Sequence, residues 1–128
     1  EGDIFAMGGS FSFRRTWVNY IPAVTYGNDV VVDYVTFPKE AAWFHENLKN
    51  LHVHVVYVVL WADYNTLIKR DEMRKPEYQM GDRCLLLVEE FKKSGLDEKH
   101  LLDTSRKTTK DMEYIVEEIM KNPRYRMK

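Results

Sequence analysis

The stretch that decides the fold is residues 53–61, with the sequence VHVVYVVLW. β-Branched and aromatic side chains fill it almost without interruption, which is typical of a β-strand. A strand exposed on one face would alternate apolar and polar residues, and this stretch does not. The pattern therefore predicts a strand covered on both faces, as in a parallel sheet between two layers of helices.

Other segments of the chain extend this pattern in both directions. Residues 29–36, DVVVDYVT, predict a second buried strand, residues 99–103 a weaker one, and residues 1–5 read like the end of a strand. Helical periodicity or capping signals mark residues 38–49, 63–74, 80–94 and 108–120. Strands that alternate with helices predict an α/β domain with a mostly parallel sheet.

Size and composition limit the possible classes of protein. The 128 residues suffice for one domain, and 19 basic against 20 acidic residues leave a net charge of −1. This balance argues against a nucleic acid or an anionic membrane as the partner. The longest apolar run, residues 55–62, is far shorter than the roughly 20 residues that span a bilayer. The single cysteine, Cys84, suits the reducing cytoplasm, and the protein is expected to be a monomer or a homodimer.

Polar side chains follow the predicted strands at the points where those strands end. In open α/β sheets, ligands bind at the carboxyl ends of the strands. Carboxylates beside arginines at one edge would suit an anionic ligand that chelates a metal ion, such as a nucleoside triphosphate. The acidic and hydroxyl residues at these ends are Asp3, Asp33, Asp63, Asp103, Thr104 and Ser105, and the nearby arginines are Arg70, Arg74 and Arg83.

Each of these residues also has a purely structural interpretation. Asp33 lies within a valine-rich strand, where a buried carboxylate needs a partner, and that partner is either a Mg²⁺-linked or substrate group or a salt bridge. The arginines could be solvated helix residues, and residues 103–105 could form only a turn and a cap. His52 and His54 lack a third ligand and are interpreted as structural rather than zinc-binding.

The sequence resembles the small P-loop kinases of gluconate-kinase, shikimate-kinase and chloramphenicol-phosphotransferase type. The matching segments are residues 30–34 (VVVDY), 58–63 (VVLWAD) followed by 67–74 (LIKRDEMR), and 102–105 (LDTS) before a capped helix. Residues 1–3 resemble the start of the substrate-side segment that follows the second strand of such kinases. The likeness covers most of the chain from Asp29 onward and is greatest to bacterial proteins of gluconate-kinase type.

The resemblance implies a three-layer αβα P-loop NTPase fold of the adenylate-kinase kind. Residues 1–128 would form one such domain, incomplete at its N-terminus, with a short lid around residues 70–83. Asp3 would orient or deprotonate the acceptor, Asp33 would serve Mg²⁺ or the acceptor, and Arg74 would act in catalysis. The residues implied to bind ATP are Arg70, Arg74, Arg83, Asp103, Thr104 and Ser105.

One motif of these kinases is not found in the sequence. G-x-x-x-x-G-K-[ST], whose backbone N–H groups and lysine hold the phosphates, does not occur among the 128 residues. The family places the strand that carries it in the middle of the sheet, between the strands predicted at residues 29–36 and 53–61. We therefore expect about 30 further residues upstream, which would form a strand, a phosphate loop and a helix. Without that strand, unpaired backbone groups would flank an empty slot.

Taken together, the residues and the resemblance predict an ATP-dependent phosphotransferase that acts with Mg²⁺. It would move the γ-phosphoryl group to a hydroxyl of a small-molecule acceptor, which the sequence does not identify. The alternative is a nucleotide-binding regulatory module of the same fold that transfers nothing. The missing phosphate loop would favour this alternative if the native gene also lacks it.

Overall fold

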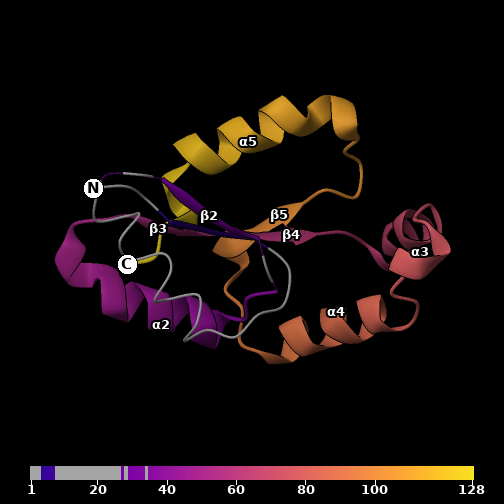
Figure 1. Cartoon of the computed structure of the whole chain (residues 1–128), viewed down its shortest axis with the longest axis horizontal. Helices are drawn as coiled ribbons and strands as arrows, with labels where there is room; N and C mark the ends of the chain where they lie inside the picture. Colours follow the sequence, from indigo (N-terminus) through magenta and orange to yellow (C-terminus); the bar gives the residue numbers. More distant parts are fainter. Residues whose placement is uncertain (1–3, 8–26, 28, 34) are drawn as a thin grey trace.

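Short strands and helices alternate along the protein in a computed structural model that describes residues 4–7, 27, 29–33 and 35–128 (Figure 1). Among these residues, no helix combines the length and the apolar character needed to cross a membrane. The α-helices are α2 (Pro38–Leu48), α3 (Tyr64–Glu72), α4 (Arg83–Lys93) and α5 (Met112–Lys121). The strands are β1 (Ile4–Met7), β2 (Val30–Asp33), β3 (Val55–Tyr57), β4 (Val59–Trp61) and β5 (Leu101–Asp103).

All strand pairs of the described sheets are parallel, as predicted. One sheet has the order β2-β1-β3, and the other pairs β4 with β5. The predicted strand at residues 53–61 is therefore two short strands, β3 and β4, separated only by Val58. It pairs with β1 through its first half and with β5 through its second half, which explains why one apolar segment belongs to two sheets.

The central position of the first sheet is taken by β1. Strands β2 and β3 do not pair with each other, which confirms the expected separation, and Ile4 is in register with both Val30 and Val55. The resemblance implied that a strand upstream of residue 1 would take this position, or that a gap would be left there. In the structure β1 itself lies there, and the backbone of residues 4–7 pairs with β2 and β3, so no slot remains between these two strands.

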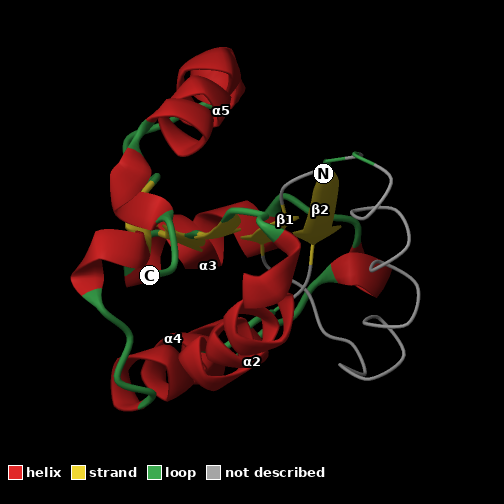
Figure 2. Ribbon diagram, turned by 90° about the vertical axis from the view of Figure 1, so that its left-hand side faces the viewer, coloured by secondary structure: helices red, strands yellow, loops and turns green. Residues whose placement is uncertain are grey.

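Helices cover the sheet region from two sides, which gives three layers. Helices α2 and α4 lie on one side and α5 on the other (Figures 1 and 2). Alternate residues of the central segment face the two layers: Tyr57 and Val59 cluster with Ala41 of α2, whereas Val56 and Val58 cluster with residues of α5. Residues 55–59 are thus buried on both faces, as predicted, whereas Leu60 in the same apolar run is 43% exposed.

Strand β2 departs from that prediction. Its residues alternate between buried and exposed, so that Val32 packs against Phe44 and Leu48 of α2 while Val31 is 58% exposed. Asp33 falls on an exposed position of the same alternation. Asp33 is therefore not a buried carboxylate that needs a partner, contrary to the prediction, because period-two alternation places it in solvent.

Local signals set the ends of the helices. The Asp63 side chain caps α3 by accepting a hydrogen bond from the backbone N–H of Thr66 at 2.8 Å. Pro38 opens α2, and Gly95 follows α4 with a φ of 76°, a conformation that favours glycine. Thr108 caps the short 3₁₀ turn Thr109–Asp111 that leads into α5. Each cap lies where the sequence predicted it.

A buried histidine lies under β3. His100 is 5% exposed, and its Nδ1 lies 2.9 Å from the carbonyl oxygen of Tyr57. A carbonyl can only accept, so the neutral ring carries its proton on Nδ1. Burial lowers the pKa of His100 below its ordinary value of 6.5.

The free energy of unfolding should fall as the pH is lowered from about 7.5 to about 5.5. The folded pKa of His100 is lowered, so the unfolded state binds the proton first and gains stability on acidification. Urea unfolding at several pH values measures this effect. The His100→Gln variant should lose the pH dependence in this range, whereas His52→Asn, at an exposed position, should retain it. Equal pH dependence in wild type and His100→Gln would contradict the assignment.

Candidate functional site

The carboxyl ends of β4 and β5 border a hollow of about 500 Å³. Trp61 and Asp103 are partners in the register of these parallel strands, which brings the two loops after them together. The hollow therefore combines carboxylates from two neighbouring strand ends with two cations of the loop after β5. We call it the β4–β5 hollow; the described residues that line it are Trp61, Asp63, Asp103, Ser105, Arg106 and Lys107.

Hydrogen bonds organise the loop after β5. The Ser105 hydroxyl donates to the Asp103 carboxylate at 2.6 Å and accepts from the backbone N–H of Asp63 at 2.8 Å. Hydrogen bonds from Thr66 lower the pKa of the Asp63 carboxyl, and hydrogen bonds from Ser105 lower that of Asp103. Both groups are consequently carboxylates at neutral pH. Asp103 ends β5, and Ser105 lies in the turn that follows it, as the sequence allowed; both residues line the hollow.

The side chain of Arg70, in α3, stabilises this loop through hydrogen bonds. Its guanidinium donates to the Thr104 hydroxyl at 2.8 Å, to the Thr104 carbonyl at 2.5 Å and to the Lys107 carbonyl at 3.2 Å. Thr104 in turn donates through its N–H and its hydroxyl to the carbonyl of Trp61. The structure thus places Arg70 as a positioning residue of the loop, whereas the resemblance implied a direct contact with the nucleotide.

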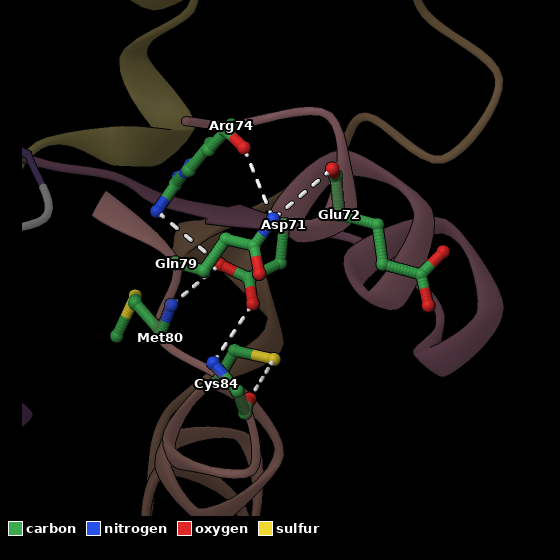
Figure 3. Close-up of polar contacts among 7 residues, drawn as sticks. Asp71, Glu72, Arg74, Gln79, Met80 and Cys84 are labelled. Carbon is green, nitrogen blue, oxygen red and sulfur yellow. Dashed lines mark hydrogen bonds and ion pairs between the residues drawn. The ribbon is translucent and has the colours of Figure 1, made fainter. Parts of the chain in front are cut away.

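A second polar cluster joins the two ends of the predicted lid (Figure 3). Asp71 is only 8% exposed, and its carboxylate accepts hydrogen bonds from the backbone N–H groups of Met80 and Gly81, each at 2.8 Å. The Gln79 amide donates to the carbonyls of Glu72 and Arg74. These contacts connect the end of α3 to the start of α4, so the loop between the two helices is anchored at its base.

Sequence reasoning missed Asp71, although a signal for it existed. An acidic residue in the last turn of a helix is unfavourable beside the negative end of the helix dipole, so its presence indicates a local donor. Here the hydrogen bond from Met80 is the main cause that lowers the pKa of Asp71. Arg74, which was predicted, lies with Nη1 3.8 Å from the Asp71 carboxylate, and its side chain is 53% exposed.

A further hollow of about 620 Å³ lies between α2, α4 and the segment that follows β2. Its residues Val35 and Phe37 follow the carboxyl end of β2, which runs parallel to the other strands, so this hollow borders the same edge of the sheet as the β4–β5 hollow. Arg83, which the resemblance implied for nucleotide binding, borders this second hollow instead of the first. We call it the α2–α4 hollow; the described lining residues are Val35, Phe37, Glu40, Arg83, Leu86, Leu87 and Glu90.

The predicted residues are thus divided among several places at one edge of the sheet. Asp33 ends β2, just before the segment that borders the α2–α4 hollow, and pairs in register with Met7. Within the described ranges, no group of three or more His, Cys, Asp or Glu side chains could hold a metal ion. Asp3 lies outside the described residues.

A scan against models of protein families finds no match, and a search of curated proteins also finds none.

Proposed function

We propose that this protein is an ATP-dependent phosphotransferase that acts on a hydroxyl of a small-molecule acceptor. The observation that carries the proposal is the pair of hollows at the carboxyl edge of the sheet. One has carboxylates and cations suited to a nucleotide, and the other has apolar walls suited to a second small molecule. A reaction between two substrates needs two such sites within reach of each other.

The β4–β5 hollow would take the nucleotide. Arg106 and Lys107 line it and supply positive charge for phosphate oxygens, while Trp61 offers an aromatic surface for a base. The hydrogen bonds of Arg70 and Ser105 hold the loop in place before a ligand arrives, which lowers the cost of binding.

The donor set at this edge is compatible with Mg²⁺. This ion keeps several of its waters and binds through one or two carboxylates together with phosphates of the substrate. A single exposed carboxylate such as Asp33 therefore suits Mg²⁺ better than a site in which protein groups supply every ligand. When bound, Mg²⁺ would neutralise charge on the triphosphate.

In the proposed reaction, the acceptor oxygen forms a bond to the γ-phosphorus while the bond from that phosphorus to the bridging oxygen of ADP breaks. The hydroxyl proton passes to a carboxylate, for which Asp3 is the candidate from the sequence. Arg74, on the loop between α3 and α4, would meet the charge that develops on the transferred group. The products are ADP and the phosphorylated acceptor.

The alternative is a nucleotide-binding regulatory module, which would use the β4–β5 hollow without transferring phosphate. One observation favours it: G-x-x-x-x-G-K-[ST] does not occur in the 128 residues. Phosphoryl transfer depends on charge neutralisation by such a lysine, whereas base and ribose binding do not.

ATP binding by calorimetry and Mg²⁺-dependent phosphate release, both measured on the protein expressed from its complete gene, test the proposal. We expect wild type to turn ATP over and Asp33→Asn to lower turnover at least about tenfold without loss of fold, because the two side chains are similar in volume. Asp29→Asn, at the residue just before β2, is the matched control and should leave turnover unchanged. Tight ATP binding without turnover would replace the kinase by the regulatory module, and no ATP binding would refute both.

A further inference from the structure

The lining of the α2–α4 hollow combines apolar walls with an excess of negative charge. Val35, Phe37, Leu86 and Leu87 supply the walls. The charged groups among the described lining residues are two carboxylates, Glu40 and Glu90, against the single guanidinium of Arg83. A ligand placed there meets both apolar side chains and a net charge of −1.

One wall of this hollow is held rigidly. The Phe37 ring packs against the Phe91 ring of α4 with their centres 4.4 Å apart, and the Tyr57 hydroxyl donates to the Thr36 carbonyl at 2.5 Å. Thr36 is 3% exposed. The segment between β2 and α2 is therefore fixed from behind, so the shape of this wall does not depend on a ligand.

The opposite wall leaves apolar surface in solvent. Leu86 lines the hollow and is 61% exposed. A ligand that covers such an exposed apolar side chain removes apolar surface from water, which favours binding. The hollow thus favours a molecule with an apolar part.

Glu40 adds a polar group to the lining. It is partly buried, and among the described residues the donor to its Oε1 is the backbone N–H of Phe37, at a long 3.3 Å. A carboxylate can accept about four hydrogen bonds, so capacity for a ligand donor remains. Burial raises the pKa of Glu40, and a hydroxyl or ammonium donor would offset that cost.

We propose that the α2–α4 hollow binds the acceptor and that this acceptor is an amphipathic molecule, uncharged or cationic, with an apolar ring or chain and a hydroxyl or amine group. That this ligand is the acceptor of the reaction rests on the proposed function, whereas its chemical class is inferred from the lining residues alone. A sugar acid would bring a further negative charge toward Glu40 and Glu90 and would leave the leucine wall uncovered.

Two matched probes test the ligand class without any nucleotide. Phenylethanolamine and phenyllactate both carry a phenyl ring and a hydroxyl, but the first is a cation and the second an anion. Backbone NMR titration of the protein should show phenylethanolamine binding with a Kd on the order of 1 mM, at least about fivefold tighter than phenyllactate. The shifted amides should include Arg83 and Leu87.

Neighbouring glutamates on α4 provide a matched pair of variants. Glu90→Gln should weaken phenylethanolamine binding about threefold to fivefold, because Glu90 lines the hollow at an exposed position. Glu89→Gln should change it little, because Glu89 contacts Tyr64 and Lys92 away from the hollow. Leu86→Ser, also at an exposed position, should weaken the binding of both probes.

The proposal is overturned if phenyllactate binds as tightly as phenylethanolamine, if neither probe binds, or if Glu90→Gln has no effect. Two combinations of results separate a failure of this ligand class from a failure of the proposed function. Phenylethanolamine binding without ATP turnover would support the ligand class and contradict the phosphotransferase. ATP turnover without probe binding would contradict the ligand class alone.

Discussion

Replacing Arg74 by alanine should slow ATP turnover roughly a hundredfold and leave the affinity for ATP almost unchanged. An arginine that meets the transferred phosphoryl group interacts more strongly with the transition state than with bound ATP. Loss of one such contact costs about 3 kcal/mol in the activation barrier. In the free protein, Arg74 is half exposed and its contact with Asp71 is long, so its guanidinium is available to a ligand.

The matched control for this variant is Lys75→Ala, the next residue along the exposed loop. It removes a positive charge at nearly the same place and should slow turnover much less. Calorimetry with ATP and a phosphate-release assay separate binding from turnover for both variants. If Arg74→Ala changes neither quantity, Arg74 is only a solvated loop residue and the catalytic assignment is wrong.

Replacing Arg70 by alanine should lower the free energy of unfolding by about 3 kcal/mol, because hydrogen bonds to a charged group are among the stronger ones. The variant removes the Arg70 donor from the carbonyls of Lys107 and Thr104, and the Thr104 carbonyl keeps only the hydrogen bond from the backbone N–H of Lys107. The loop after β5 then loses its support, so ATP affinity should also fall, as a consequence of disorder in the loop. Urea unfolding and ATP calorimetry measure the two effects.

Lys69→Ala is the control, since Lys69 is exposed and adjacent to Arg70 in α3. It should change stability by only a few tenths of a kcal/mol. If Arg70→Ala leaves the free energy of unfolding unchanged and strongly weakens ATP binding, Arg70 contacts the phosphates directly. That result would support the role that the resemblance implied.

Much of the secondary structure could be predicted because its signals are local. Pro38, the Asp63 cap and Gly95 mark helix ends through the conformation of one or two residues, and each lies where the structure has the boundary. The division of the strand predicted at residues 53–61 into β3 and β4 could not be predicted. Their separation at Val58 depends on which neighbours the two halves pair with, and those neighbours are β1 and β5.

The candidate site was predictable only in outline. The rule that ligands bind at the carboxyl ends of parallel strands pointed to the edge of the sheet that both hollows border. It could not assign Arg70 to the loop after β5, since the partners of its side chain lie 34 and 37 residues away. The role of Arg83 in the α2–α4 hollow likewise depends on how α4 packs beside α2.

The sequence by itself determined the alternation of strands and helices, the parallel character of the sheet and the burial of residues 55–59 on both faces. These properties follow from residue type and period, which act within a few positions. Only the tertiary structure decided that β1 lies at the centre of its sheet, that Asp33 is exposed and that the edge carries two separate hollows. Those properties depend on which distant segments meet, and the chain settles that by pairing backbone groups and burying apolar side chains together.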